Sequence, residues 1–266
     1  MGSGLQRASA VALLLGLVIG AAWLAPARLL GHLVQQGSNG AVRLAGVSGT
    51  LWSGSAQVQF HPERLGGDDQ ARPQPPIVLP GRVSWNTGWS WQGGLLLRLQ
   101  SPQLSGPVAE QPMEVQQWWT ARPVVWVPDG ALRLPHMNLR HATGPLALFR
   151  PEFKAALQWS GLKSNDLAAL RLTLTLEDLG SALSPIRPLG SYRVALAPEG
   201  EAARTWTWRL ESLGDPVIVL TGQGRLDPML RGRLALQCMR SCEFVGGILS
   251  AVGKKNGEVY EAQFGL

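Results

Sequence analysis

The order of apolar and polar residues divides the chain into two parts. The first part is a run from Ala8 to Ala27 that contains no charged residue and is flanked by Arg7 and Arg28. In the second part, apolar and polar residues alternate in short stretches separated by Gly and Pro. Such alternation is typical of half-buried β-strands joined by turns. The pattern therefore predicts one apolar helix followed by a β-rich domain.

The charge-free run has the length of a membrane-spanning helix, because about 20 apolar residues cross a hydrocarbon core of about 30 Å. Trp23 lies near its far end, where an aromatic ring suits the membrane interface. Pro26 would end the helix, and Arg7 favours a cytoplasmic N-terminus. The predicted organisation is a cytoplasmic N-terminus over residues 1–7, a transmembrane signal anchor over 8–27 and a periplasmic β-rich domain over 28–266.

A cleavable secretory signal is the alternative interpretation of the same run. Ala25-Pro26-Ala27 provides small residues at the spacing of a cleavage site, although Pro lies inside that site. Both interpretations export the chain from about residue 28 onward, which in a bacterium means into the periplasm. Whether the segment is cleaved stays open at the level of sequence.

The alternating part predicts about a dozen short strands. They are expected over residues 42–44, 56–60, 82–85, 94–99, 123–126, 131–139, 153–162, 167–176, 192–197, 205–211, 217–226, 231–238 and 258–264. Short helices are expected over 29–37 and 244–252, and an exposed loop over 66–80. Pro128-Asp129-Gly130 is a strong turn sequence and predicts a hairpin between its two flanking strands. The absence of long helices between the strands excludes a doubly wound parallel sheet and favours an antiparallel all-β fold.

The charge of the chain changes this picture little. The formal net charge is +6, which could indicate nucleic-acid binding. The basic residues are spread singly along the chain, and Lys254-Lys255 is the one adjacent pair. Dispersed charges of this kind are typical of a solvated surface, so no nucleic-acid partner is expected. Contact with anionic lipid headgroups fits the same charge.

Candidate catalytic residues are few. His136 and His141 are five residues apart, so strand alternation would place them on opposite faces. The acidic pairs Asp68-Asp69 and Glu177-Asp178 stand in turn-like sequence. The chain contains neither a Gly-x-Ser-x-Gly elbow nor a phosphate-binding glycine loop. We therefore expect no enzyme activity and no catalytic, cofactor-binding or metal-binding residues.

The two cysteines, Cys238 and Cys242, are four residues apart. Across a tight turn they could form a disulfide, which persists in an exported protein. Two buried free thiols are the alternative. A zinc site is not expected from two cysteines without a nearby histidine.

Tryptophan is the most informative residue type, with eleven copies against two tyrosines. Trp206 and Trp208 are two apart and would share one face of a strand, as would Trp89 and Trp91. They could fill the core of a sheet, or they could form an exposed aromatic face for a partner or a lipid.

A family resemblance rests on Gly49-Thr50-Leu51-Trp52-Ser53-Gly54, placed shortly after the N-terminal anchor and before a Trp-rich segment. Leu79-Pro80-Gly81-Arg82-Val83-Ser84-Trp85, the segment Gly222-Gln223-Gly224-Arg225-Leu226 and the ending after the cysteines add to it. Together they resemble the type II secretion system protein N (GspN) family over most of the chain. The hexapeptide by itself is expected to be structural, a turn and strand in which Leu51 and Trp52 face opposite sides.

The resemblance implies a single-pass protein of the bacterial inner membrane with most of the chain in the periplasm. It implies an accessory or scaffold role in the machinery that exports folded proteins across the outer membrane, with other secretion-system membrane proteins as partners. It also implies a mainly β fold, a curved antiparallel sheet that forms an AsmA-like groove or a sandwich. The family supplies no catalytic residues or cofactors.

Two further functions remain as alternatives. A curved sheet with an apolar face could make the chain a periplasmic lipid-binding or lipid-transfer module, with a groove lined by Leu, Val and Trp. A periplasmic hydrolase is the third alternative, and a pair of perturbed acidic or His side chains in one cleft would support it.

Overall fold

The computed structural model describes residue 20 and residues 24–61, 76–120, 122–138, 151–181, 184–200, 205–227, 229–240 and 242–264. Apart from Gly20, the charge-free segment up to Trp23 lies outside the described residues, as do Asp68, Asp69 and His141. Among the helices that the structure describes, none is long and apolar enough to cross a membrane. The transmembrane part of the predicted fold therefore stays a prediction.

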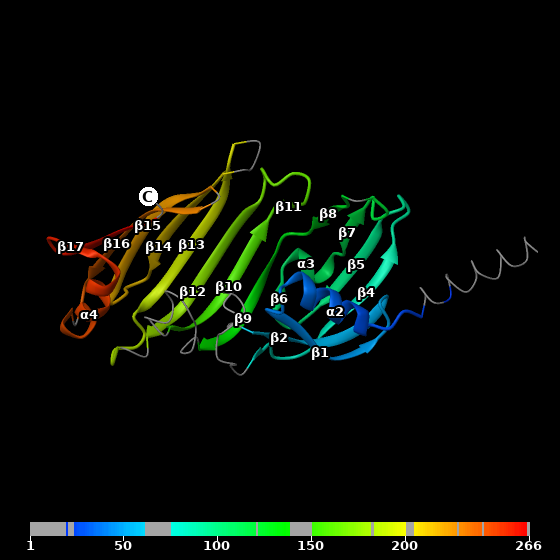
Figure 1. The fold of residues 1–266 in the computed structure, drawn as a ribbon, viewed down its shortest axis with the longest axis horizontal. Coiled ribbons are helices and arrows are strands. Elements are labelled where there is room, and N and C mark those ends of the chain that lie inside the picture. Colours follow the sequence, from blue (N-terminus) through cyan, green and yellow to red (C-terminus); the bar gives the residue numbers. More distant parts are fainter. Residues whose placement is uncertain are drawn as a thin grey trace, which may run out of the picture.

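The described chain is mainly β, as predicted, and its strands form two antiparallel sheets (Figure 1). The first sheet has the order β1-β2-β4-β5-β7-β8-β11, and β3 pairs with β2. Its strands are β1 (Val42–Gly49), β2 (Ser53–Phe60), β3 (Ile77–Val78), β4 (Val83–Trp89), β5 (Leu95–Gln100), β7 (Met113–Gln116), β8 (Val124–Val127) and β11 (Leu162–Lys163).

The second sheet has the order β17-β18-β16-β15-β14-β13-β12-β10-β9-β6. Its strands are β6 (Leu104–Ser105), β9 (Gly130–Asn138), β10 (Pro151–Ser160), β12 (Arg171–Ser181), β13 (Gly190–Glu199), β14 (Thr205–Leu213), β15 (Ile218–Asp227), β16 (Met229–Cys238), β17 (Lys254–Asn256) and β18 (Val259–Phe264). From β12 to β16, each strand pairs with the one that follows it in the chain, as in an up-and-down meander.

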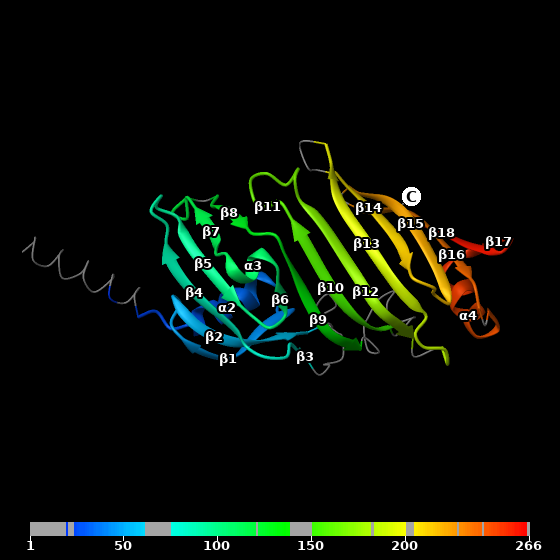
Figure 2. The same ribbon diagram turned by 180° about the vertical axis from the view of Figure 1, so that it is seen from behind.

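The two sheets lie side by side along the long axis of the molecule, so they are not the facing layers of a sandwich (Figure 2). Five connections cross the junction, and among them β8 leads into β9 through Pro128 and β10 leads into β11 through Gly161. The hairpin predicted around Pro128-Asp129-Gly130 is therefore wrong, because β8 pairs within the first sheet and β9 within the second. The turn sequence instead connects β8 of the first sheet to β9 of the second sheet.

Helices cover only parts of the sheets. They are α2 (Arg28–Gly37), α3 (Pro107–Glu110) and α4 (Cys242–Val252). One core cluster joins Ala27, Ala56 and Trp85, with Leu30 of α2 packed against it. A second cluster joins α4 to the far end of the ten-stranded sheet through Val245 and Leu249.

Candidate functional site

The hexapeptide that carries the family resemblance forms the turn between β1 and β2. Gly49 ends β1 with φ +93°, a left-handed conformation that suits glycine, and Ser53 begins β2. The Thr50 amide donates to the Ser53 carbonyl oxygen at 2.8 Å, and the Ser53 amide donates to Thr50 Oγ1 at 3.1 Å. The hexapeptide is thus a closed, hydrogen-bonded turn with one strand on each side.

The N-terminal segment is fastened to this turn by backbone hydrogen bonds. The Leu51 amide donates to the Ala25 carbonyl oxygen at 2.8 Å, and the Ala27 amide donates to the Gly49 carbonyl oxygen at 3.2 Å. Pro26 forms an isolated bridge with Thr50. The last residues of the predicted anchor, Ala25 and Ala27, are therefore hydrogen-bonded to the β1–β2 turn of the first sheet.

The second segment of the resemblance, around Arg82 and Trp85, packs on the same turn. The Trp85 indole N–H donates to the Leu51 carbonyl oxygen at 3.1 Å. The Arg82 guanidinium donates to the Gly46 carbonyl oxygen at 2.7 Å and to the Ser55 carbonyl oxygen at 3.1 Å. These bonds span a β-bulge in β1, where the register shifts between Ala45 and Ser48.

An apolar cavity of about 420 Å³ lies between helix α2 and the first sheet. Leu30 and Val34 of α2 line one side of it, and the sheet lines the other through residues such as Leu97. Leu51 and Trp52 both line this cavity, so the expectation that they face opposite sides is wrong. The two residues stand in a turn, where the strict alternation of a strand does not apply.

A chain of four tryptophan rings extends from the cavity to the surface. Ring centroids are 6.4 Å apart between Trp52 and Trp89, 5.5 Å between Trp89 and Trp118, and 5.7 Å between Trp118 and Trp119. We call Trp52, Trp89, Trp118 and Trp119 the tryptophan cluster. Such aromatic contacts hold the rings in place although three of them are exposed.

The ten-stranded sheet has one face that is apolar across most of its strands. Cross-strand partners share a face, and the register aligns Trp159, Leu172, Leu196 and Trp208 across four neighbouring strands. Leu172 and Leu196 are half-buried, as are most of their apolar neighbours on this face. Helix α4 covers the far end of the face, where Leu236 is buried against Val245 and Leu249.

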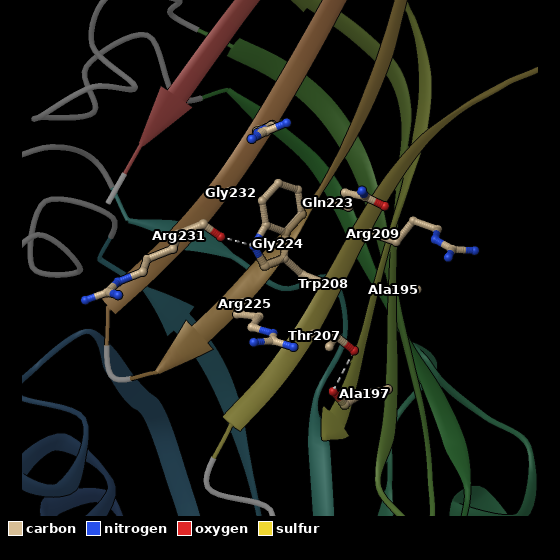
Figure 3. Close-up of a pocket in the computed structure, with 11 residues that line it drawn as sticks. Ala195, Ala197, Thr207, Trp208, Arg209, Gln223, Gly224, Arg225, Arg231 and Gly232 are labelled. Carbon is tan, nitrogen blue, oxygen red and sulfur yellow. Dashed lines mark hydrogen bonds between the residues drawn. The ribbon is translucent and has the colours of Figure 1, made fainter. Parts of the chain in front are cut away.

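The opposite face of the same sheet is polar and rich in arginine (Figure 3). A hollow of about 970 Å³ over β13 to β16 is lined by Arg209, Arg225 and Arg231, among others. In the close-up the side chains of Arg209 and Arg231 point away from each other, and Arg225 is paired with Glu199 at 2.7 Å. The guanidinium groups do not converge on one point, so they do not form a phosphate cradle.

The residues considered for catalysis that the structure describes lie on separate strands, β9 and β12. His136 is exposed on β9. Asp178 accepts a bond from Lys154 Nζ at 3.0 Å, and this contact raises the pKa of Lys154. Within the described ranges, no group of three or more His, Cys, Asp or Glu residues could hold a metal ion. The described acidic and histidine side chains thus give no support to the hydrolase alternative.

The two cysteines form a disulfide, with Cα atoms 5.7 Å apart. Cys238 ends β16 and Cys242 begins α4, so the bond closes the turn that leads into this helix.

Tyr192 lies near the core beneath α4, and its hydroxyl donates to the Ile218 carbonyl oxygen at 2.8 Å. Burial raises the pKa of Tyr192, which keeps the phenol neutral.

A model of the type II secretion system (T2SS) protein N family matches residues 40–243. The chain belongs to this family. No curated protein and no solved structure matches the chain. Membership of the T2SS protein N family connects the chain with type II secretion and implies association with other components of that system. The matched range begins before β1 and ends at the start of α4, so it includes nearly all strands of both sheets.

Sequence reasoning missed three features of this part of the T2SS protein N chain. The clamp that Arg82 forms on the β1 bulge has no signal in a single sequence, because it depends on contacts with residues 27 and more positions away. The cavity could not be predicted, because it depends on where α2 packs on the sheet. The sequence places Trp89, Trp118 and Trp119 near turns, which is a signal for the tryptophan cluster. Only the strand register shows that these turns lie at one end of the sheet.

Proposed function

We propose that this member of the T2SS protein N family is an inner-membrane-anchored accessory component whose β domain lies in the periplasm. In this role it binds other membrane proteins of the secretion system and thereby supports export of folded proteins across the outer membrane. The observation that carries the proposal is the family match over residues 40–243, which coincides with the two joined sheets. We therefore assign the proposed role to the two sheets.

The proposed anchor is supported by the charge-free run that precedes the sheets. The run from Ala8 to Ala27 has the composition and length of a membrane span. Its last residues are hydrogen-bonded to the β1–β2 turn, so no linker separates the anchor from the domain. Arg7 on the other side of the run favours a cytoplasmic N-terminus and hence a periplasmic domain.

The proposed mode of action is binding rather than catalysis. The half-buried apolar face of the ten-stranded sheet and the exposed tryptophans offer large surfaces for association. The sheet edges are less suited to strand pairing. At the edge strand β1, the bulge at Gly46 distorts the backbone. At the edge strand β17, Lys254 and Lys255 are exposed. A bulge and exposed lysines both oppose the pairing of an edge strand with another chain.

Purification of the intact chain from membranes tests the proposal. A C-terminally tagged chain, extracted in mild detergent from cells that carry a type II secretion system, is expected to bring other secretion-system membrane proteins with it. The untagged chain is the control. Recovery of none of these components, together with normal secretion after deletion of the chain, would contradict the accessory role.

Location is tested separately. The chain should stay in the membrane pellet after alkaline carbonate extraction, and protease should digest its β domain in spheroplasts but not in intact cells. Release by carbonate would contradict the anchor. Protection in spheroplasts would contradict the periplasmic orientation, because the outer surface of the inner membrane is then accessible.

Lipid binding is a second candidate function, and the cavity under α2 favours it. Its lining is apolar apart from Thr87, and an empty apolar space of this size can hold part of an acyl chain. Native mass spectrometry of the full chain released from detergent should then show bound phospholipid. Val34→Phe would narrow the cavity and reduce the bound fraction, whereas Leu33→Phe on the exposed side of the same helix would not. Equal occupancy in both variants would exclude the cavity as the site.

A further inference from the structure

Three connections of the first sheet lie at the same end of the sheet. In this antiparallel meander, β1 ends where β2 begins, β4 ends where β5 begins, and β7 ends where β8 begins. The pairs Gly49 with Gly54, Trp89 with Leu95, and Gln116 with Val124 mark these three turns. The pairing of β2 with β4 and of β5 with β7 places all three turns at the same end of the sheet.

These turns expose tryptophan and carry little charge. The exposed fractions are 52% for Trp89, 91% for Trp91, 47% for Trp118 and 65% for Trp119. Residues 49–53, 89–95 and 116–124 contain no acidic residue, and Arg122 is their one charged side chain. Large aromatic side chains are rarely grouped on a surface that faces only water. The composition of this end therefore calls for an apolar or interfacial partner.

The N-terminal segment reaches the sheet at this same end. Ala25 is hydrogen-bonded to Leu51, the residue next to Trp52 of the tryptophan cluster. Leu24, one residue earlier, is 73% exposed, and the chain before it is the charge-free run. In Figure 1 the described chain enters the first sheet from the side of the picture on which β4 ends. The exit from the proposed membrane span thus lies beside the exposed tryptophans.

The geometry points to a membrane-seated surface: the tryptophan cluster with Trp91 rests in the headgroup region of the bilayer that the N-terminal segment spans. This inference rests on the proposed anchor and specifies which end of the β domain contacts the membrane. Because the two backbone bonds at Ala25 and Ala27 leave no linker, an anchored domain must hold this end of the sheet against the lipid surface. The partner is the phospholipid interface of the same membrane.

The chemistry of the surface matches that partner. Indole rings favour the interface, where the ring meets acyl chains and the N–H meets water and headgroups. Arg28, which begins α2, and Arg122 are exposed at this end, and the half-buried Glu114 lies against Gly94 of the β4–β5 turn. A basic residue near the surface of an anionic membrane is attracted to the lipid headgroups. The absence of Asp and Glu from the three turns removes repulsion from anionic lipid.

Tryptophan quenching in vesicles tests the inference. The full chain is reconstituted into vesicles of phosphatidylethanolamine and phosphatidylglycerol, with or without phospholipid brominated on its acyl chains. Trp91→Phe, Trp118→Phe and Trp119→Phe are combined in one variant. Trp126→Phe is the matched control, because Trp126 is exposed on the same sheet and aligned with Glu114, on the face opposite to Val115 of the cavity.

Bromolipid should quench the wild-type emission, and the triple variant should lose about half of the quenched intensity. The Trp126→Phe variant should keep all of it. Quenching that Trp23→Phe abolishes and the triple variant leaves unchanged would overturn the inference. Quenching of the cluster by aqueous iodide instead of bromolipid would also overturn it, because the rings would then lie in water and not in the bilayer.

The same preparation separates this inference from the proposed anchor. If carbonate releases the chain from the vesicles, both the proposed anchor and the contact of the tryptophan surface with the bilayer are contradicted. If the chain resists carbonate and bromolipid does not reach Trp91, Trp118 and Trp119, the anchor stands and the seating alone is overturned.

Discussion

Trp85 stands directly opposite Gly54 on the neighbouring strand, and a Cβ on Gly54 would lie 2.5 Å from Cζ2 of the indole ring. The missing side chain of Gly54 is what lets the ring lie on the strand. The ring is buried, and its N–H reaches the Leu51 carbonyl oxygen in the turn. One glycine and one tryptophan thus fix the turn on the sheet.

The same arrangement occurs twice in the second sheet. Trp159 stands opposite Gly130 and donates to the Pro128 carbonyl oxygen at 2.9 Å. Trp208 stands opposite Gly224 and donates to the Arg231 carbonyl oxygen at 3.0 Å. Placing a large ring over a strand glycine protects the backbone and fixes register. The three pairs lie at the first turn, at the junction of the sheets and in the long meander.

Gly54→Ala is expected to destabilise the fold by about 2–3 kcal/mol, because the new methyl group would collide with Trp85 and with the Ser48 carbonyl oxygen. The midpoint of urea unfolding of the full chain in detergent, followed by far-ultraviolet circular dichroism, measures the change. Gly88→Ala is the matched control, since Gly88 also lies in a strand and a Cβ there meets no atom within 4 Å. Equal shifts for both variants would contradict the packing argument.

Trp208→Phe should cost about 2–4 kcal/mol, because it leaves space over Gly224 and Gly232 and removes the donor to the Arg231 carbonyl. The same unfolding measurement applies. Trp126→Phe, at an exposed position of the other sheet, should change the midpoint little. A loss for Trp208→Phe no larger than that for Trp126→Phe would show that the ring does not hold the meander together.

Arg82→Met should loosen the bulge in β1 while keeping most of the side-chain volume. It removes the charged donors to the Gly46 and Ser55 carbonyl oxygens, at a cost of about 1–2 kcal/mol for this exposed group. Hydrogen exchange of the β1 amides should speed up, and that of β15 should not. Arg82→Lys should restore only part of the protection, since one ammonium group cannot reproduce the fork of a guanidinium. Unchanged exchange in Arg82→Met would contradict the clamp.

Most strands could be predicted from sequence because each alternates apolar and polar residues over its own length. The run from Arg171 to Leu176 predicts β12, and the same pattern predicts β13 to β16. The two helices expected after the anchor and after the cysteines correspond to α2 and α4. Strands of two or three residues, such as β6 and β11, were missed because so short a run has no period to detect.

The junction of the sheets and the site could not be predicted, because both depend on pairing between distant segments. Pro128-Asp129-Gly130 has the sequence of a hairpin turn, yet β9 pairs with β10 and β6 and not with β8. Trp and Gly were recognised as separate signals in the sequence. Only the register shows that Trp85 faces Gly54 and that the exposed Trp89 and Trp118 meet.

Removal of the disulfide by a double Cys238→Ser and Cys242→Ser substitution should loosen α4 rather than unfold the chain. The bond closes a short loop, so its expected contribution is about 2 kcal/mol in the chain-entropy model. Hydrogen exchange should increase in α4 and at Leu236 beneath it, and stay unchanged in β4 of the other sheet. A uniform increase over both sheets would contradict a local role for the bond.

Tyr192→Phe tests the buried phenol through the dependence of stability on pH. The variant loses the bond to the Ile218 carbonyl oxygen and should be less stable by about 1 kcal/mol near neutral pH. In the wild type, burial raises the folded-state pKa of Tyr192 above the unfolded value of about 10. Below about pH 10 both states hold the proton and the contribution of the phenol is complete.

Above about pH 10 the unfolded chain releases this proton while the folded chain keeps it. The wild type should therefore lose stability as the pH rises from about 10 toward the folded-state pKa, whereas Tyr192→Phe lacks this component. The difference between the two unfolding midpoints should shrink over this range and then reverse. Parallel curves would show that the hydroxyl of Tyr192 can ionise in the folded state without cost, which its burial between Leu189 and Ile218 argues against.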